Sequence, residues 1–223
     1  MSDAPSTSSS TSSSTSSLLA PGETLHVGTL VYDQVEELDF VGPFEVFKAA
    51  SLQWGRLHGS DHRPLRVFTV AERTGLLTTS GGLQVQPSHT FSDHPAIDLL
   101  VVPGGQGSRT QVSNPAVLAW LRRVAPGARV ASSVCTGAFF LGELGLLDGH
   151  SATTHWASLD RLAERYPQVR VKRETRWTDE GAVVTSAGIS AGMDMSLHLV
   201  ERFLGRDVAE ATAHHMEYRW NEG

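Results

Sequence analysis

The stretch Arg129-Val130-Ala131-Ser132-Ser133-Val134-Cys135-Thr136-Gly137-Ala138-Phe139-Phe140-Leu141 contains the only cysteine of the chain. Small and β-branched residues precede Cys135, and a Gly-Ala step followed by apolar residues at helical spacing comes after it. This pattern predicts a strand that ends in a sharp turn and passes directly into a helix, as a nucleophile elbow does.

A thiol at such a turn lies at the N-terminus of a helix, where unpaired backbone N–H groups and the helix dipole favour an anion. We therefore expect the pKa of Cys135 to fall well below neutrality and the side chain to be a thiolate nucleophile. The alternative is a buried cysteine that acts as a small hydrophobic residue, which is the more common role of a single cysteine. The local pattern leaves both interpretations open.

The length and composition of the chain indicate one α/β domain rather than two large ones, because it has 223 residues of which 40% are hydrophobic. The net charge of −6, without a stripe of Lys and Arg, argues against a nucleic-acid partner. No apolar run approaches the roughly 20 residues of a membrane span. One cysteine permits no intramolecular disulfide, which favours a reducing, cytoplasmic compartment.

Residues 1–17 consist almost entirely of Ser and Thr and cannot bury enough apolar surface to offset their ordering entropy. They also lack the basic start and apolar core of a secretory signal. The following residues, with Pro21-Gly22, lead into the folded part. We predict a disordered Ser/Thr-rich tail over residues 1–24 and one domain over residues 25–223.

From Leu25 onward, apolar runs of strand length alternate with helical patterns. Strands are expected at residues 25–31, 65–70 and 97–102, in the run before Cys135, and at residues 169–171, 175–178 and 182–185. Helices are expected at residues 42–50, 115–124 (with Asn114 as the N-cap), 136–144, 156–165, 190–204 and 208–216. This alternation predicts a mostly parallel sheet covered by helices on both faces.

Ligands of such sheets bind outside the carboxyl ends of the strands. Three predicted strand ends carry suitable chemistry, and they are Glu36-Glu37-Leu38-Asp39, Pro103-Gly104-Gly105 and Cys135-Thr136. We expect the fold to bring these three segments together.

Five blocks in order resemble the ThiJ/PfpI superfamily, and within it the isonitrile hydratase-like proteins. The blocks are Leu38-Asp39-Phe40-Val41-Gly42-Pro43, Val102-Pro103-Gly104-Gly105, Ser133-Val134-Cys135-Thr136-Gly137, Ala152-Thr153-Thr154-His155-Trp156 and Ser186-Ala187-Gly188-Ile189-Ser190-Ala191-Gly192-Met193-Asp194. The resemblance runs from about Leu25 to Trp220. The same blocks occur in sensor domains fused to helix-turn-helix regulators, and a chain that ends soon after Trp220 is expected to lack that DNA-binding module.

The resemblance implies a class I glutamine amidotransferase-like fold, a flavodoxin-like sandwich with Cys135 as the elbow nucleophile. It implies that Asp39 lies near the cysteine and takes part in the chemistry, and that Thr136 offers its backbone N–H and hydroxyl. It also implies that the N–H groups of Gly104 and Gly105 face the site, where glycines allow backbone donors to approach a developing negative charge. The resemblance implies no cofactor. It does imply a homodimer in which the site lies near the subunit interface.

His155 occupies the region where several superfamily members place a histidine near the cysteine, and a Cys–His pair would activate the thiol. The alternative is a structural histidine at a helix start, and Trp156 is interpreted as a packing residue. Asp39 has its own alternative, the cap of a helix that starts near Gly42. Glu36 and Glu37 are interpreted as solvated charges, either of which can replace Asp39 if that residue points away from the site.

No metal site is predicted. His58 and His62 lie in a loop-like stretch, and His214 and His215 are adjacent, so neither pair supplies three or four ligands. 

The resemblance implies, as the favoured function, cofactor-independent hydration of a small isonitrile to an N-substituted formamide. Either Cys135 attacks the isonitrile carbon while Asp39 protonates it, or Asp39 activates water while Cys135 orients the substrate. One alternative is a glyoxalase or deglycase acting on α-oxo aldehydes, which needs a glutamate and His155 around the cysteine. The other is a small-molecule or redox sensor in which Cys135 is oxidised, and peptidase activity is the least favoured.

Overall fold

The computed structural model describes residues 19–20 and 22–222, so most of the predicted Ser/Thr-rich tail lies outside the described residues. The short segment just before the first strand contacts the folded part. Glu23 forms an ion pair with Arg129, and its carbonyl accepts a hydrogen bond from Nε2 of His62 at 2.9 Å.

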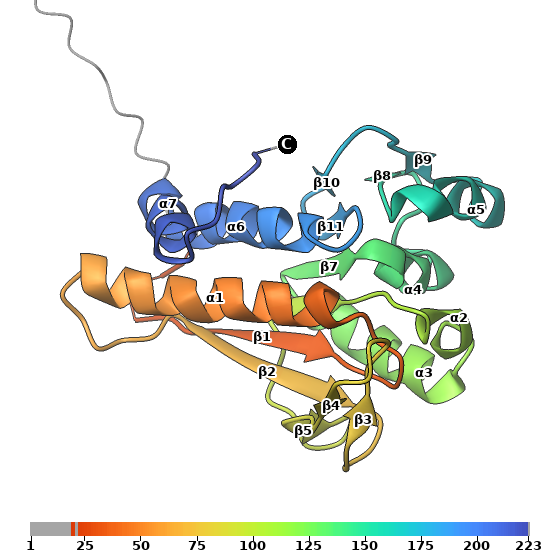
Figure 1. The fold of residues 1–223 in the computed structure, drawn as a ribbon, viewed down its shortest axis with the longest axis horizontal. Helices are drawn as coiled ribbons and strands as arrows, with labels where there is room; N and C mark the ends of the chain where they lie inside the picture. The colour runs from red at the N-terminus through yellow and green to blue at the C-terminus, as the bar shows by residue number, and fades with distance from the viewer. Residues whose placement is uncertain (1–18, 21, 223) are drawn as a thin grey trace, which may run out of the picture.

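A mostly parallel sheet forms the centre of the fold (Figure 1), and its strand order within the described residues is β10-β11-β7-β6-β1-β2-β5. All neighbouring strands of this sheet are parallel except β10, which pairs antiparallel with β11 at one edge. The strands are β1 (Leu25–Leu30), β2 (Leu65–Ala71), β5 (His89–Thr90), β6 (Leu99–Val102), β7 (Val130–Val134), β10 (Trp177–Asp179) and β11 (Val183–Ser186). Two small pairs stand apart, β3 (Leu77–Thr78) with β4 (Gln84–Val85) and β8 (Ser151–Ala152) with β9 (Arg170–Val171).

Helices cover both faces of the sheet, as predicted. The long helices α1 (Glu37–Leu57), α6 (Ala191–Leu204) and α7 (Arg206–His215) pack against one another over one face (Figure 1). The other face carries α3 (Pro115–Val124), α4 (Ala138–Glu143) and α5 (Leu159–Arg165), with the short α2 (Ser108–Gln111) beside them. The described residues also form the 3₁₀ turns η1 (Ala125–Gly127), η2 (Cys135–Gly137) and η3 (Trp156–Ser158).

The alternation of side chains along each strand explains why the sheet is buried on both faces. Leu99 and Val101 belong to the core under α1, α6 and α7, whereas Leu100 and Val102 belong to the core under α3, α4 and α5. All four are at most 1% exposed. Successive strand residues point to opposite faces, so a continuous apolar run is what a doubly covered parallel strand requires.

The start of α1 differs from the prediction, because the helix begins at Glu37 rather than near Gly42 and Pro43 lies inside it. A proline inside a helix removes one hydrogen bond, here the one that the carbonyl of Asp39 would have accepted. The additional turn is stabilised by Phe40, which is 4% exposed and packs in the core. Burial of a phenylalanine contributes about 2–3 kcal/mol, which offsets much of the cost of the proline.

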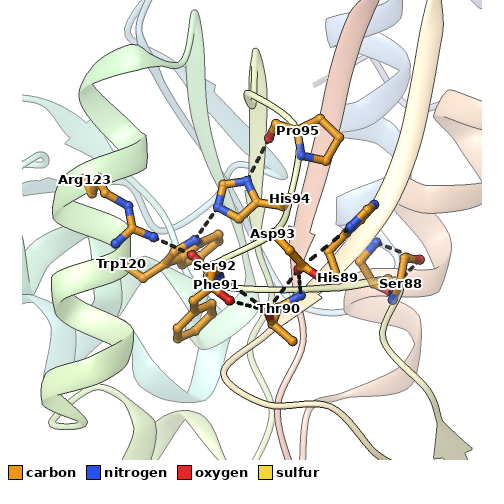
Figure 2. Close-up of polar contacts among 11 residues, drawn as sticks. Ser88, His89, Thr90, Phe91, Ser92, Asp93, His94, Pro95, Trp120 and Arg123 are labelled. Carbon is orange, nitrogen blue, oxygen red and sulfur yellow. Dashed lines mark hydrogen bonds and ion pairs between the residues drawn. The ribbon is translucent and has the colours of Figure 1, made fainter.

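The edge strand β5 is fixed to α3 by the segment that follows it (Figure 2). Nε1 of Trp120 donates to Nε2 of His94 at 2.9 Å, and the ring of Phe91 stacks on that of Trp120. Arg123 donates to the carbonyl of Phe91 at 2.6 Å. The predicted helix 115–124 is confirmed with its cap, since the Asn114 side chain accepts the N–H of Ala116 at 2.9 Å.

Within the described part of the chain, no helix combines the length and the apolar character needed to cross a membrane.

Candidate active site

The order in which the chain adds strands to the sheet reverses between β1 and β6. From β1, the chain first adds β2 on one side, and it later adds β6, β7 and β11 on the other side. Ligands of open α/β sheets bind outside the carboxyl ends of the strands at such a reversal. The three predicted segments meet there. Asp39 follows β1, Gly104 and Gly105 follow β6, and Cys135 follows β7.

Cys135 forms the sharp turn that the sequence predicts. Its φ is +56°, in the left-handed region that residues other than glycine seldom adopt, and its side chain is 7% exposed. The carbonyl of Cys135 accepts a hydrogen bond from the hydroxyl of Thr154 at 2.7 Å, and its N–H donates to the carbonyl of Ala187 at 3.3 Å. These two bonds hold a strained backbone in place, and strain of this kind is concentrated at functional sites.

Asp39 lies completely buried beside the thiol rather than at the cap of α1. It is the third residue of the helix and 0% exposed, and the residue at the N-cap is Glu36, which makes no side-chain capping bond. Oδ2 of Asp39 accepts the N–H of Gly104 at 3.0 Å, whereas Oδ1 has no hydrogen-bond partner among the described residues. A buried, half-satisfied carboxyl is costly for stability, which is typical of a functional group.

Gly104 and Gly105 lie at the site, but their N–H groups already have partners. The N–H of Gly104 donates to Asp39, and the N–H of Gly105 donates to Oγ1 of Thr136 at 3.2 Å. The Thr136 hydroxyl also lies 2.9 Å from Oγ of Ser108. Gly105 has a φ of +114° and passes close to the backbone that precedes α1, where a side chain does not fit. The two glycines therefore position Asp39 and Thr136 instead of presenting open donors.

Tyr32, which the sequence alone did not identify as a site residue, holds the turn at Pro103 and Gly104 in place. The buried hydroxyl of Tyr32 donates to the carbonyl of Pro103 at 2.7 Å and lies 3.0 Å from the carbonyl of Gly104. Burial raises the pKa of Tyr32 well above its ordinary value, and the nearby Asp39 and Cys135 raise it further. Tyr32 is therefore a neutral donor that fixes the glycine turn against the site.

The expectation of a thiol with a depressed pKa is wrong. Burial raises the pKa of Cys135 far above its ordinary value, the neighbouring Asp39 carboxyl raises it further, and the N–H of Thr136 opposes both effects. The helix dipole is weak here because a three-residue 3₁₀ turn and a six-residue helix follow the cysteine. A buried, low-dielectric position with an acidic neighbour outweighs a short helix terminus.

The pKa of Asp39 is also raised. Burial raises its pKa to about 7, the N–H of Gly104 opposes this, and the carboxylate of Glu36 adds to it. Two buried acids that repel each other's charge titrate as a pair, and above neutral pH the pair of Asp39 and Cys135 holds one proton. The carboxyl of Asp39 and the thiol of Cys135 can therefore share a single proton.

A pocket of about 340 Å³ opens above the cysteine, and its lining residues come from all three segments and from the region after β8. The lining residues are Glu36, Gly105, Gln106, Arg109, Cys135, Thr136, His155, Ala157, Ser158, Arg161 and Ile189. The volume is that of a small-molecule site.

The interpretation of Glu36 and Glu37 as solvated charges is wrong. Glu36 is half-buried in the pocket wall and accepts a hydrogen bond from the hydroxyl of Ser80 at 3.0 Å. Glu37 accepts the hydroxyl of Thr79 and, at 2.7 Å, the N–H of Gly81. These bonds hold the pKa of Glu37 below its ordinary value, so Glu37 fastens the loop after β3 to the start of α1.

His155 lines the same pocket as Cys135, and the structure gives it a capping role as well. Its Nδ1 accepts the N–H of Ala157 at 3.3 Å, at the start of η3, and its ring packs against Gly188, where any side chain would collide with it. Trp156 does not pack in the core as interpreted, because 78% of its surface is exposed. The chain turns Trp156 outward since the carbonyl of His155 begins a tight 3₁₀ turn.

Ile189 completes the pocket and carries the second strained backbone of the site. Its φ is +53°, which is exceptional for a β-branched residue, and 38% of its surface is exposed toward the pocket side of the molecule. The helix that follows it is anchored by the fully buried Asp194, which pairs with Arg176 at 2.5 Å. The block from Ser186 to Asp194 is the signal that points to this segment, whereas the strain itself is not visible in the sequence.

Among the described residues, no three His, Cys, Asp or Glu side chains are grouped so that they could hold a metal ion. His58 and His62 instead bond the carbonyls of Trp54 and Glu23.

Burial of Asp39 predicts a specific pH dependence of stability. Its pKa is about 7 in the folded protein and about 3.9 in an unfolded chain. The folded state therefore binds more protons between these values, and its stability falls as the pH rises through this window. We expect the Asp39→Asn variant, which carries no charge, to be more stable than the wild type at pH 8 by about 2–4 kcal/mol.

Urea unfolding at pH 5 and pH 8 measures this effect. Asp61→Asn, at an exposed loop position, is the matched control and is expected to leave the pH dependence of the wild type unchanged. A wild type and an Asp39→Asn variant with the same pH dependence would show that Asp39 is not a strained buried acid.

A parallel sheet with a cysteine elbow at its topological reversal defines the class of this protein. Structures of this class have the class I glutamine amidotransferase-like fold. The sequence model of the DJ-1/PfpI family matches residues 26–202, and the chain belongs to that family.

Three relatives illustrate the range of the family. The chain is 37% identical to isonitrile hydratase of Pseudomonas putida over 87% of its own length and 78% of that enzyme. It is 35% identical to the HTH-type transcriptional regulator GbdR of Pseudomonas aeruginosa over 83% of its own length, which spans 48% of the regulator. Its structure resembles that of a ThiJ/PfpI family protein from Pseudomonas syringae with a TM-score of 0.77 and 28% identity, covering 90% of this chain and 78% of the other.

Proposed function

We propose that the protein hydrates a small isonitrile to an N-substituted formamide, using Cys135 and Asp39 and no cofactor. The observation that carries this proposal is the completely buried Asp39, whose carboxyl interacts directly with the thiol of the elbow cysteine Cys135. Similarity to the isonitrile hydratase of Pseudomonas putida supports the substrate class. The addition of water across the isonitrile carbon needs a nucleophile and a proton donor at the same place, which this pair supplies.

The single proton of the pair accounts for the first step. Ionised Asp39 takes the thiol proton of Cys135, the sulfur bonds to the isonitrile carbon, and Asp39 returns the proton to that carbon, which gives a thioimidate. The N–H of Thr136 stabilises the sulfur while it carries negative charge.

Water then completes the reaction. Asp39 accepts a proton from water as the water oxygen bonds to the thioimidate carbon, and Asp39 passes this proton to the substrate nitrogen. The carbon–sulfur bond then breaks as the new hydroxyl becomes the formamide carbonyl, and Asp39 carries the hydroxyl proton to the sulfur. The N-substituted formamide leaves, with the thiol protonated and Asp39 ionised as at the start. The alternative route, in which Asp39 activates water for direct attack and Cys135 orients the substrate, forms no bond to sulfur.

A second candidate is an α-oxo aldehyde glyoxalase, because Glu36 and His155 line the same pocket as Cys135. That reaction needs a base that moves a proton between adjacent carbons of a hemithioacetal, and Glu36 is the candidate for this role. Each carboxyl has one occupied oxygen, by the Ser80 hydroxyl in Glu36 and by the N–H of Gly104 in Asp39. Of the two, Asp39 is the one that is completely buried with its pKa raised to about 7, which suits proton exchange near neutral pH. Together with the similarity to an isonitrile hydratase, this makes the hydratase the better supported function.

The two functions are separated by incubating the purified protein with cyclohexyl isocyanide and, separately, with methylglyoxal. We expect N-cyclohexylformamide from the first and no lactate from the second. Lactate formation that is lost in Glu36→Gln would replace the hydratase with the glyoxalase. Inertness toward both reagents would favour a sensor domain like those of the regulators.

We also propose that the protein forms a homodimer with the pocket near the interface, in line with the resemblance. The exposed Trp156 adjoins the pocket residues His155 and Ala157 and offers a large apolar surface there. Sedimentation equilibrium should give twice the chain mass, and Trp156→Glu is expected to weaken the association. A monomer at micromolar concentration would contradict this proposal.

A further inference from the structure

Two arginines stand in the wall of the pocket above Cys135. Arg109 comes from α2 and Arg161 from α5, and both line the pocket together with the cysteine. Figure 1 shows α2, α4 and α5 gathered at one end of the molecule. The guanidinium of Arg161 lies 4.2 Å from the centre of the Phe139 ring on α4, a cation–π contact that holds this side chain in place.

Neither arginine has an acidic partner among the described residues, in contrast to its neighbours. Arg165, on the next turn of α5, pairs with Glu143 at 2.9 Å, and Arg173 pairs with Asp160 at 2.7 Å. Partial burial lowers the pKa of Arg161, and the positive charges of Arg109 and Arg165 lower it further. Arg109 and Arg161 are thus close enough to repel each other, and an anion between them would relieve that repulsion.

Charge is distributed unevenly over the pocket. Glu36 lies near Asp39 and raises its pKa, so the reacting end of the pocket is acidic. The two arginines form a basic part of the same wall. With two positive side chains and one negative side chain, the lining suits a singly charged anion better than a doubly charged one, and guanidinium groups bind carboxylates through paired N–H donors.

We propose that Arg109 and Arg161 select a substrate with a carboxylate group, which they hold while the electrophilic carbon of the substrate faces Cys135. Given the proposed function, on which this inference rests, the substrate class is a small isonitrile that bears a carboxylate. A neutral isonitrile is then a poorer substrate, because the pocket gains no charge-assisted hydrogen bonds from it.

The first test compares isocyanoacetate with methyl isocyanoacetate, which carry the same isonitrile group and differ in charge. We expect kcat/KM to be at least tenfold higher for the acid, and we expect Arg109→Gln combined with Arg161→Gln to remove this preference by lowering the value for the acid. Arg66→Gln combined with Arg122→Gln removes two exposed arginines outside the pocket, and this control should keep the preference. Equal values for the acid and the ester in the wild type would overturn the inference.

The second test does not depend on hydratase activity. Iodoacetate and iodoacetamide alkylate thiols by the same displacement, in which a carbon–sulfur bond forms, iodide leaves and the thiol proton goes to solvent. Cys135 is the only cysteine, so the gain in mass of the intact protein reports it alone. We expect the ratio of the iodoacetate rate to the iodoacetamide rate to fall at least fivefold in the double pocket variant and to stay unchanged in the control variant.

The outcomes distinguish failure of the anion-binding proposal from failure of the proposed hydratase function. An unchanged ratio in the pocket variant, or failure of iodoacetate to reach Cys135, would overturn the recognition of an anion. Loss of the proposed function alone would appear as absence of formamide from every isonitrile, while the alkylation ratio still depends on Arg109 and Arg161.

Discussion

Replacement of Cys135 with alanine is expected to lower kcat/KM for cyclohexyl isocyanide by roughly 10⁴-fold or more, as loss of a catalytic nucleophile does. The fold should persist, because the cysteine side chain is small and the turn is held by backbone bonds to Thr154 and Ala187. The rate of N-cyclohexylformamide formation measures the loss, and circular dichroism with urea unfolding verifies the fold. Activity within tenfold of the wild type would exclude Cys135 from the chemistry.

The same residue distinguishes the two routes of hydration. If the sulfur attacks the isonitrile carbon, rapid acid quenching during turnover should give protein heavier by the mass of one isonitrile, with the addition mapped to Cys135. Cys135→Ser keeps the shape of the side chain with a much weaker nucleophile, and it should show neither the adduct nor the activity. Full activity without an adduct at any quench time would favour direct attack by water.

Replacement of Asp39 with asparagine is expected to lower kcat by about 10²–10⁴-fold, the usual contribution of a general acid–base group. Asparagine keeps the size of the side chain and can still accept the N–H of Gly104 through its carbonyl oxygen. It cannot take the proton of the thiol. The loss should therefore appear in kcat, with little change in the binding of a substrate analogue.

The raised pKa of Asp39 also predicts the direction in which kcat/KM changes with pH. The pKa of Asp39 is raised to about 7, and the productive form of the pair has Asp39 ionised and Cys135 protonated. Below pH 7 both groups are protonated and no base remains, so kcat/KM for the wild type should rise with pH and level off above about pH 7–8. The rise should be absent from the residual activity of Asp39→Asn. A wild-type rate that falls as the pH increases through 7 would contradict this assignment.

Much of the fold was predictable because burial on both faces imposes a simple pattern. The apolar run before Pro103 predicted a central strand, and the four-residue β6 is buried throughout. Asn114 before Pro115 predicted the start of α3 correctly, since capping is a local property of the chain. The start of α1 was not predictable in this way, because tertiary packing of Phe40 outweighs the local preference of Pro43.

The meeting of Asp39, Gly104 and Cys135 was predictable because parallel strands present their carboxyl ends at one edge of the sheet. The pKa values of Asp39 and Cys135 were not predictable from the sequence. The pKa of a thiol depends on burial and on neighbours distant in sequence, and here those effects exceed that of a short helix. Arg109 and Arg161 lie 52 positions apart with no motif around them, so only the folded chain shows that they share a pocket.

Cys135 and Asp39 are proposed to act as one catalytic unit on an isonitrile. The most direct measurement is the rate of N-cyclohexylformamide formation by the wild type, Cys135→Ala, Asp39→Asn and the double variant under identical conditions. Residues that act as a unit give non-additive losses, so we predict that the double variant is no slower than Cys135→Ala alone. Losses that multiply in the double variant, or a wild type that forms no formamide, would contradict the claim.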